Sequence, residues 1–219
     1  MPPTYTGDVE VGGPAQTREA SGLRITKIAV GTFNNNCYLL ENISTGDLVL
    51  IDAASEPSTL LNLIADRPLS GIVTTHQHAD HWQALEDVKA ATGAPTYAHP
   101  ADVDGLPIPP DRLLNEGDTL KVGDIELEAI HLVGHTPGSI ALLHAADSDQ
   151  PHLITGDCLF PGGTGRTENP TDFGHLIDDV TAKIFDRLPD STWIYPGHGA
   201  DTTLGVERPH LDEWRARGW

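Results

Sequence analysis

The chain has 219 residues, enough for one large domain or two small ones with a substantial buried core. It carries 13 Lys and Arg against 32 Asp and Glu, a formal net charge of −19, which argues against nucleic acid as a ligand and against an anionic membrane surface as a partner. Its two cysteines, Cys37 and Cys158, predict no disulfide framework, and no signal peptide or membrane-length apolar run is recognisable, so a cytoplasmic location is expected.

The first half of the chain predicts short strands interrupted by helices. Residues 1–22 are polar and rich in Gly, Pro and Thr, which predicts a loose N-terminal arm or an added edge before a single domain over residues 23–219. Strands are expected at residues 23–30, 37–42, 48–52, 71–75 and 95–98. Helices are expected at residues 57–66, with Ser55 as N-cap, and at residues 82–92, where Gly93 ends the helix.

The second half repeats this style after a proline-rich loop over residues 99–110. Strands are expected at residues 112–120, 125–131, 140–144, 152–155 and 192–195, and helices at residues 176–187 and 207–217. This order of elements predicts an α+β fold in which two sheets pack face to face and helices flank them.

The segment Thr75-His76-Gln77-His78-Ala79-Asp80-His81 carries the strongest chemical signal. It directly follows a predicted buried strand, and in an extended segment the side chains of His76 and His78 point the same way. A tight turn after them would direct Asp80 and His81 towards a second, adjacent point. Imidazole and carboxylate groups together suit zinc, iron or manganese, so the segment predicts a metal-dependent enzyme.

Three later segments place a further candidate ligand where a strand meets a loop, and glycine beside each ligand lets the backbone turn sharply. Together with the first cluster they supply five histidines and two aspartates, too many for one tetrahedral zinc but suitable for two adjacent metals that share a carboxylate. The three ligands are His135 in Gly134-His135-Thr136-Pro137-Gly138-Ser139, Asp157 in Thr155-Gly156-Asp157, and His198 in Pro196-Gly197-His198-Gly199.

Other residues near these segments have weaker expectations. Thr136 and Ser139 are candidates for steering the ligands through their hydroxyls, although ordinary turn capping explains them equally well. Arg166 would contact a substrate carboxylate or fix its own loop. Cys158 and Tyr195 are interpreted as core residues. Surface or core positions are also expected for the remaining histidines, His99, His131, His144, His152, His175 and His210, with a position beside a cleft as an alternative for His175.

Taken together, the motifs resemble those of the metallo-β-lactamase superfamily, whose pattern is His-x-His-x-Asp-His, a Gly-His-Thr-Pro-Gly histidine, an aspartate after glycine and a late Gly-His. The resemblance covers nearly the whole chain from Leu23 and implies an αββα sandwich with the metals at one edge. By motif match, it implies one metal held by His76, His78 and His135, a second held by Asp80, His81 and His198, and Asp157 as the bridge between them.

Within that superfamily the chain looks most like the glyoxalase II-like hydrolases, through Gly156-Asp157-Cys158-Leu159-Phe160, Gly165-Arg166-Thr167-Glu168 and Thr202-Thr203-Leu204-Gly205 after the late Gly-His. The resemblance implies cleavage of a small-molecule thioester by a hydroxide generated at two divalent metals, with zinc expected and iron or manganese as alternatives. Asp80 and Asp157 would then serve the reaction directly. Basic residues are scarce after Arg166, so another thiol carrier than glutathione, or a lactone or other ester, stays open.

The nearest rival is an oxidoreductase on the same scaffold. Persulfide dioxygenases of the superfamily look similar here, and they imply a single iron at His76, His135 and Asp157. A nuclease is disfavoured by the net charge of −19. A metal-binding protein without catalysis would need an incomplete site, whereas every ligand of the pattern is present in this sequence.

Overall fold

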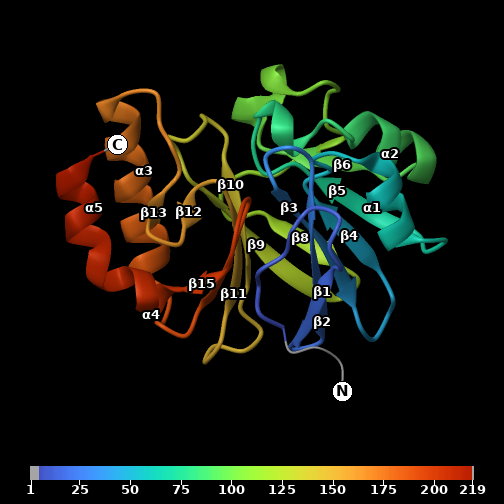
Figure 1. The fold of residues 1–219 in the computed structure, drawn as a ribbon, viewed down its shortest axis with the longest axis horizontal. Coiled ribbons are helices and arrows are strands. Elements are labelled where there is room, and N and C mark those ends of the chain that lie inside the picture. Colours follow the sequence, from blue (N-terminus) through green and yellow to red (C-terminus); the bar gives the residue numbers. More distant parts are fainter. Residues whose placement is uncertain (1–4, 219) are drawn as a thin grey trace.

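Two mixed β-sheets pack face to face in the computed structural model, which describes residues 5–218 (Figure 1). The first sheet has the strand order β1 (Gln16–Ala20), β2 (Leu23–Val30), β3 (Asn35–Asn42), β4 (Leu48–Ile51), β5 (Leu69–Val73), β6 (Thr96–Ala98) and β7 (Arg112–Leu113). The second has the order β15 (Thr202–Thr203), β14 (Trp193–Pro196), β11 (His152–Gly156), β10 (Ile140–His144), β9 (Ile125–His131) and β8 (Thr119–Val122). A small hairpin of β12 (Leu159–Phe160) and β13 (Gly163–Thr164) completes the β structure among the described residues.

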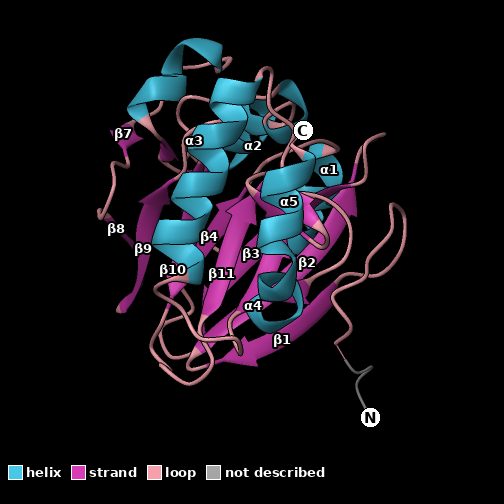
Figure 2. Cartoon of the chain, turned by 90° about the vertical axis from the view of Figure 1, so that its left-hand side faces the viewer, coloured by secondary structure: helices cyan, strands magenta, loops and turns pink. Residues whose placement is uncertain are grey.

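Helices cover the outer face of each sheet. The first sheet carries α1 (Pro57–Ile64) and α2 (Leu85–Thr92), and the second carries α3 (Pro170–Val180) and α5 (Leu211–Arg217), which lie across its strands in Figure 2. The α3 helix continues as a π-helical turn, Thr181–Phe185, and α5 is preceded by α4 (Leu204–Glu207) and a 3₁₀ turn, Arg208–His210. This is the predicted αββα sandwich, and the fold prediction is confirmed.

The alternation of side chains along the strands explains the layers. In β3, Tyr38 and Leu40 point into the core between the sheets, whereas Cys37 and Leu39 point outwards under α1 and α2. The other central strands are likewise buried on both faces, because each sheet lies between its partner sheet and its own helices. Within the described residues, no helix is long and apolar enough to cross a membrane.

Several predicted boundaries were wrong for identifiable reasons. The strand expected at residues 112–120 is two strands in different sheets, because a turn at residues 115–118, with Gly117 at φ +77°, separates β7 from β8. Glu56 rather than Ser55 is the N-cap of α1. The late helix begins at Pro170 instead of residue 176, because the side chain of Asn169 accepts the first free amide hydrogens of the helix. The helix expected at residues 207–217 is divided among α4, a 3₁₀ turn and α5.

The N-terminal segment proves to be ordered where it is described. Residues 1–4 lie outside the described part, but β1 pairs with β2 in antiparallel register and becomes the edge of the first sheet. Of the two expectations for residues 1–22, this strand corresponds to the added edge rather than to a loose arm.

Candidate metal centre

Four strands from both sheets bring the candidate ligands to one edge of the sandwich. The chain leaves β5 towards His76 and His78, and a 3₁₀ turn, Ala79–His81, follows. His135 lies between β9 and β10, and Asp157 and His198 follow β11 and β14, which run parallel and therefore end at the same edge. Across the two sheets, the amide of Ile140 donates a hydrogen bond of 3.0 Å to the carbonyl oxygen of Thr75.

Three imidazoles form the first group. Nε2 of His76 lies 3.1 Å from Nδ1 of His78 and 3.2 Å from Nε2 of His135. The His76 ring is buried, and that burial together with the neighbouring imidazoles lowers its pKa well below the ordinary value for histidine. Three imidazole nitrogens that converge on one point are a set of donors that could hold a metal ion.

A second group lies beside the first. Nε2 of His81 and Nε2 of His198 are 3.2 Å apart, and Oδ2 of Asp80 lies 3.7 Å and 3.4 Å from these two nitrogens. The neighbouring His198 and the hydrogen bond from Asn35 lower the pKa of Asp80, so this carboxylate is ionised at neutral pH. These three residues also could hold a metal ion.

Asp157 stands between the two groups. Its Oδ2 lies 3.7 Å from Nε2 of His135 and 3.4 Å from Nε2 of His198, so one carboxylate oxygen faces a histidine of each group. Its Oδ1 is buried and has no hydrogen-bond partner among the described residues, although it lies 3.4 Å from Nε2 of His81. Burial acts to raise the pKa of Asp157, but the neighbouring His81 and His198 hold it well below its ordinary value. An ionised, buried oxygen without a hydrogen-bond donor fits a site for a cation.

The orientation of the imidazoles supports the same conclusion. In four of the five, the ring nitrogen that points away from the centre donates a hydrogen bond to a fixed oxygen, which leaves the lone pair of Nε2 directed into the site. These bonds run from His76 to Thr75 Oγ1 (3.1 Å), from His81 to Asp52 Oδ2 (2.8 Å), from His135 to the carbonyl oxygen of Arg166 (2.7 Å) and from His198 to the carbonyl oxygen of Phe33 (3.0 Å).

Two buried aspartates that support the site escaped the sequence analysis. The carboxylate of Asp52, directly after β4, accepts hydrogen bonds from the amide (2.7 Å) and hydroxyl (2.8 Å) of Thr75 as well as from His81. Asp102 lies in the proline-rich loop and accepts from the amides of Gln77 (2.8 Å) and Gly138 (2.6 Å). The only available signal for Asp52 was its place at the end of an apolar strand, and Asp102 gave none.

The hydroxyls of Thr136 and Ser139 do not reach a ligand directly. The Thr136 hydroxyl donates to Asp102 at 2.6 Å and lies 2.6 Å from the hydroxyl of Ser139. They therefore fix the loop that carries His135 through Asp102. Arg166 contributes its carbonyl oxygen to His135, and its side chain is exposed.

The residues expected in the core are found there. Cys158 packs under α3 and α5, Tyr195 packs between the sheets, and burial raises the pKa of the Cys158 thiol. Among the other histidines, His99, His144 and His152 are buried, whereas His175 and His210 are exposed on helical segments. His131 is half-buried, and its ring stacks on that of His99 at 3.8 Å.

A pocket of about 410 Å³ opens beside the first group. His78 and His135 are among the residues that line it, and Glu168 and Asp172 contribute carboxylates. The nine described residues that line it include no lysine or arginine: Gln77, His78, Val133, Gly134, His135, Thr136, Pro137, Glu168 and Asp172. The pocket offers an incoming molecule a direct approach to the imidazoles.

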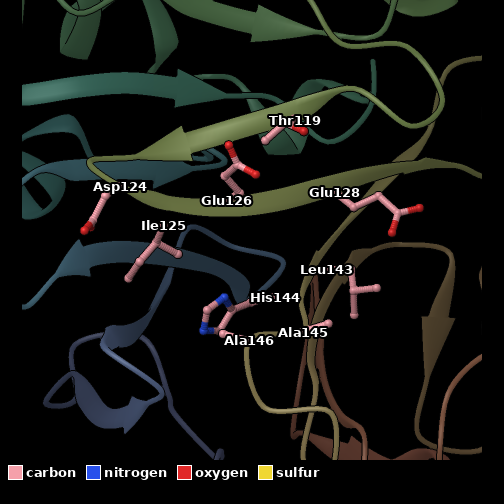
Figure 3. Close-up of a pocket in the computed structure, with 9 residues that line it drawn as sticks. All are labelled: Thr119, Asp124, Ile125, Glu126, Glu128, Leu143, His144, Ala145 and Ala146. Carbon is pink, nitrogen blue, oxygen red and sulfur yellow. The ribbon is translucent and has the colours of Figure 1, made fainter.

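A second hollow, of about 460 Å³, is separate from this centre (Figure 3). It lies over β8, β9 and the end of β10 that carries His144, whereas the metal-binding groups lie at the Ile140 end of that strand. Asp124, Glu126 and Glu128 line it, and none of the seven candidate ligands does. It is therefore not part of the candidate site.

Comparison with known proteins agrees with this geometry. The family model of the metallo-beta-lactamase superfamily matches residues 30–198, which include all seven candidate ligands. The chain belongs to the metallo-β-lactamase superfamily.

Three members of the superfamily illustrate the range of its relatives. Hydroxyacylglutathione hydrolase GloC of Haemophilus influenzae is 33% identical over 207 residues, which cover 85% of this chain and 95% of GloC. The protein TTHA1623, solved in a di-iron-bound form, is 33% identical with a TM-score of 0.69, covering 83% of this chain and 96% of its own. The BLEG-1 B3 metallo-β-lactamase is 26% identical with a TM-score of 0.77, and the match covers 85% of this chain and 97% of that protein. The resemblance seen in the motifs is thus confirmed, and the chain is a superfamily metallo-hydrolase.

Proposed function

We propose that this chain is a binuclear metallo-hydrolase that cleaves a thioester. The single observation that carries the proposal is the position of Asp157, whose carboxylate lies between the two groups of imidazoles. The proposed ligands are His76, His78 and His135 for one metal, Asp80, His81 and His198 for the other, and Asp157 for both.

When bound, two adjacent divalent metals lower the pKa of a water molecule and polarise a carbonyl group. The chain itself supplies the fixed frame for that chemistry. Asp157 would set the separation of the two ions, and Asp80, held at 2.8 Å by the side-chain amide of Asn35, would orient the second one. Asp80 and Asp157 are the proposed catalytic residues, because both lie at the point where the reacting groups would meet.

The thioester assignment draws support from the relative named hydroxyacylglutathione hydrolase and from the shape of the pocket. An acyl group bound at the metals would leave the thiol half of the substrate in the pocket beside His78 and His135. The charges there are the carboxylates of Glu168 and Asp172, and the described lining provides no basic side chain for the carboxylates of glutathione. We infer that the thiol carrier is neutral or weakly charged, with a lactone or other ester as the alternative substrate.

A persulfide dioxygenase is the second candidate. His76, His135 and Asp157 converge without any residue of the second group. Nε2 of His135 lies 3.2 Å from Nε2 of His76 and 3.7 Å from Oδ2 of Asp157. Binding of a single iron at these three residues would fit an oxidoreductase. The presence of Asp80, His81 and His198 as a second convergent group favours the hydrolase.

Elemental analysis of the purified protein combined with a substrate panel tests the proposal. The panel contains acyl thioesters of glutathione, coenzyme A and N-acetylcysteamine, a lactone and a persulfide. Two metals per chain and chelator-sensitive thioester hydrolysis are expected, and Asp157→Ala should abolish hydrolysis while the fold persists. One iron per chain with thiol-dependent oxygen uptake would replace the hydrolase by the dioxygenase.

A further inference from the structure

A buried lysine lies between the two sheets close to the loop that carries His198. Lys27 belongs to β2, and neither its side chain nor that of Asp201 has any exposed area. The ammonium group donates to Asp201 Oδ1 at 2.6 Å, to the carbonyl oxygen of Gly7 at 2.6 Å and to the carbonyl oxygen of Gly199 at 2.7 Å. All three of its hydrogens are therefore used, which is the condition for keeping a charge in a protein interior.

The other oxygen of Asp201 is equally well satisfied. Its Oδ2 accepts from the hydroxyl of Tyr5 at 2.6 Å and from the indole nitrogen of Trp193 at 2.8 Å. Gly7 passes directly over this carboxylate at φ +77°, and a Cβ atom there would lie 2.6 Å from Cγ of Asp201. The N-terminal segment thus closes over the ion pair and becomes part of it.

This ion pair contacts the backbone that positions His198. The carbonyl oxygen of Gly199 accepts hydrogen bonds from the Lys27 ammonium and from the side-chain amide of Asn36, the latter at 2.9 Å. Asn36 also holds the carbonyl oxygens of Pro196 and Gly197, at 2.8 Å and 2.7 Å. Carbonyl groups on both sides of His198 are fixed to the first sheet, although the residue itself follows a strand of the second.

The ion pair lies outside the range of the chain that the family model matches. Residues 30–198 match the family model, whereas Tyr5, Gly7, Lys27, Gly199 and Asp201 lie before or after that range. The seven candidate ligands lie within the matched range, whereas the segments that flank it supply the ion pair beside the His198 loop.

We propose that Lys27 and Asp201, closed over by residues 5–7, are positioning residues that hold His198 for the second metal. This inference rests on the proposed two-metal function. His198 has an exposed side-chain fraction of 25%, so its placement depends on its backbone rather than on close packing of its ring. Loosening that backbone should weaken binding of the second metal. Binding of the first metal should be spared, because its histidines follow other strands.

The test is a calorimetric titration of the metal-free protein with Zn²⁺. Two variants are compared with the parent: Tyr5→Phe, which removes one hydrogen bond from Asp201, and the double variant Lys27→Met with Asp201→Asn, which removes both charges together. In the double variant one of the two zinc-binding events should lose affinity by about 10–100-fold, the range for residues that support a ligand, while the other changes by less than about threefold. Tyr5→Phe should shift the same event in the same direction by a smaller factor.

Asn42→Ala provides a matched control at the other end of β3. Asn42 is buried and donates to the carbonyl oxygen of Val122 at 2.9 Å, so its loss also removes a buried contact between the sheets. Both zinc affinities should stay at their parent values in this variant. Equal weakening of both events in the double variant, or unchanged affinities in both test variants, would overturn the proposed positioning role.

A parent protein that binds one Zn²⁺ would contradict the two-metal function and not by itself the role of the ion pair. Hydrogen exchange of the metal-free protein then decides, and it also serves if the double variant fails to fold. Tyr5→Phe should accelerate amide exchange over residues 196–201 relative to residues 76–81. Unchanged exchange over residues 196–201 would rule out the ion pair of Lys27 and Asp201 as a support of His198.

Discussion

Asp52 and His81 are joined by a hydrogen bond of 2.8 Å between a carboxylate oxygen and Nδ1, and both side chains are almost completely buried. The same carboxylate holds the backbone and hydroxyl of Thr75, immediately before His76. One aspartate therefore orients residues at both candidate metal positions. It keeps the proton on Nδ1 of His81 and so leaves Nε2 free as a ligand.

Asp52→Asn tests this relationship. The amide keeps the size of the side chain and tolerates the φ of +56° at this position, but it removes the negative charge behind His81. We expect zinc affinity to fall by about 10–100-fold, measured by competition with a chelator. Asp66→Asn, an exposed position after α1, is the control, and equal affinities in the two variants would contradict the expectation.

Asp102 should contribute mainly to the stability of the folded protein, through the loops that carry His78 and His135. Asp102→Ala removes the acceptor of the buried amide of Gly138, the partly buried amide of Gln77 and the buried hydroxyl of Thr136. We expect the free energy of unfolding, measured with urea, to fall by at least about 1–3 kcal/mol, the penalty for a buried polar group without a partner. The exposed Asp104→Ala should change it by less than about 0.5 kcal/mol, and a similar small effect for Asp102→Ala would be inconsistent with the contacts.

Gly197 leaves room for the carboxylate of Asp157, the proposed bridge between the metals. A Cβ atom at this position would overlap Oδ1 of Asp157 and lie 2.8 Å from Cε1 of His81. We expect Gly197→Ala to displace Asp157 and reduce the metal content of the purified protein to fewer than two ions per chain. Gly174→Ala in α3, where a Cβ meets no atom within 4 Å, should keep the full content and gain roughly 0.5–1 kcal/mol of stability. Full metal content in both variants would argue against a bridging Asp157.

His152 should make stability depend on pH. Burial lowers its pKa to about 4, and the ring shares a hydrogen bond of 2.8 Å with the hydroxyl of Tyr195. The unfolded chain takes up this proton near pH 6.5, so the stabilisation is present above that value and is lost as the pH falls towards 4. The advantage of the parent over His152→Gln in urea unfolding should therefore shrink by about 1–2 kcal/mol between pH 7 and pH 5.

The exposed His175→Gln is the control for that measurement, because it makes the same substitution at the surface of the protein. Subtracting each variant from the parent removes the titration of the other histidines. A constant difference for His152→Gln would show that its imidazole is not held neutral in the folded protein.

The local parts of the structure could be predicted from the sequence, and the parts set by tertiary contacts could not. His76, His78, Asp80 and His81 occupy one short segment after an apolar strand, and the others stand beside glycines, so each signal is local. Asp52 and Asp102 look like ordinary acids until the fold places them against Thr75 and Gly138. The two-residue strands β12, β13 and β15 are too short for an alternating pattern to reveal them.

The same distinction explains the wrong boundaries. The turn at residues 115–118 carries Gly117 and Asp118, yet the apolar residues around it predicted one strand, because sequence pattern does not show that a chain crosses from one sheet to another. The role of the N-terminal segment was equally invisible, since Lys27 lies in a strand where a charged residue predicts a solvent-facing side. Its partner Asp201 is 174 residues away.

The hydrogen bond between Ile140 and Thr75 joins the two sheets at the edge where the candidate ligands meet. Neither half of the chain carries a complete set of ligands, because His76 to His81 come from the first sheet and His135, Asp157 and His198 from the second. Bound metal would consequently link the two sheets directly to each other. Its release on heating should coincide with separation of the sheets, so a metal-sensitive dye would report the global unfolding of this protein.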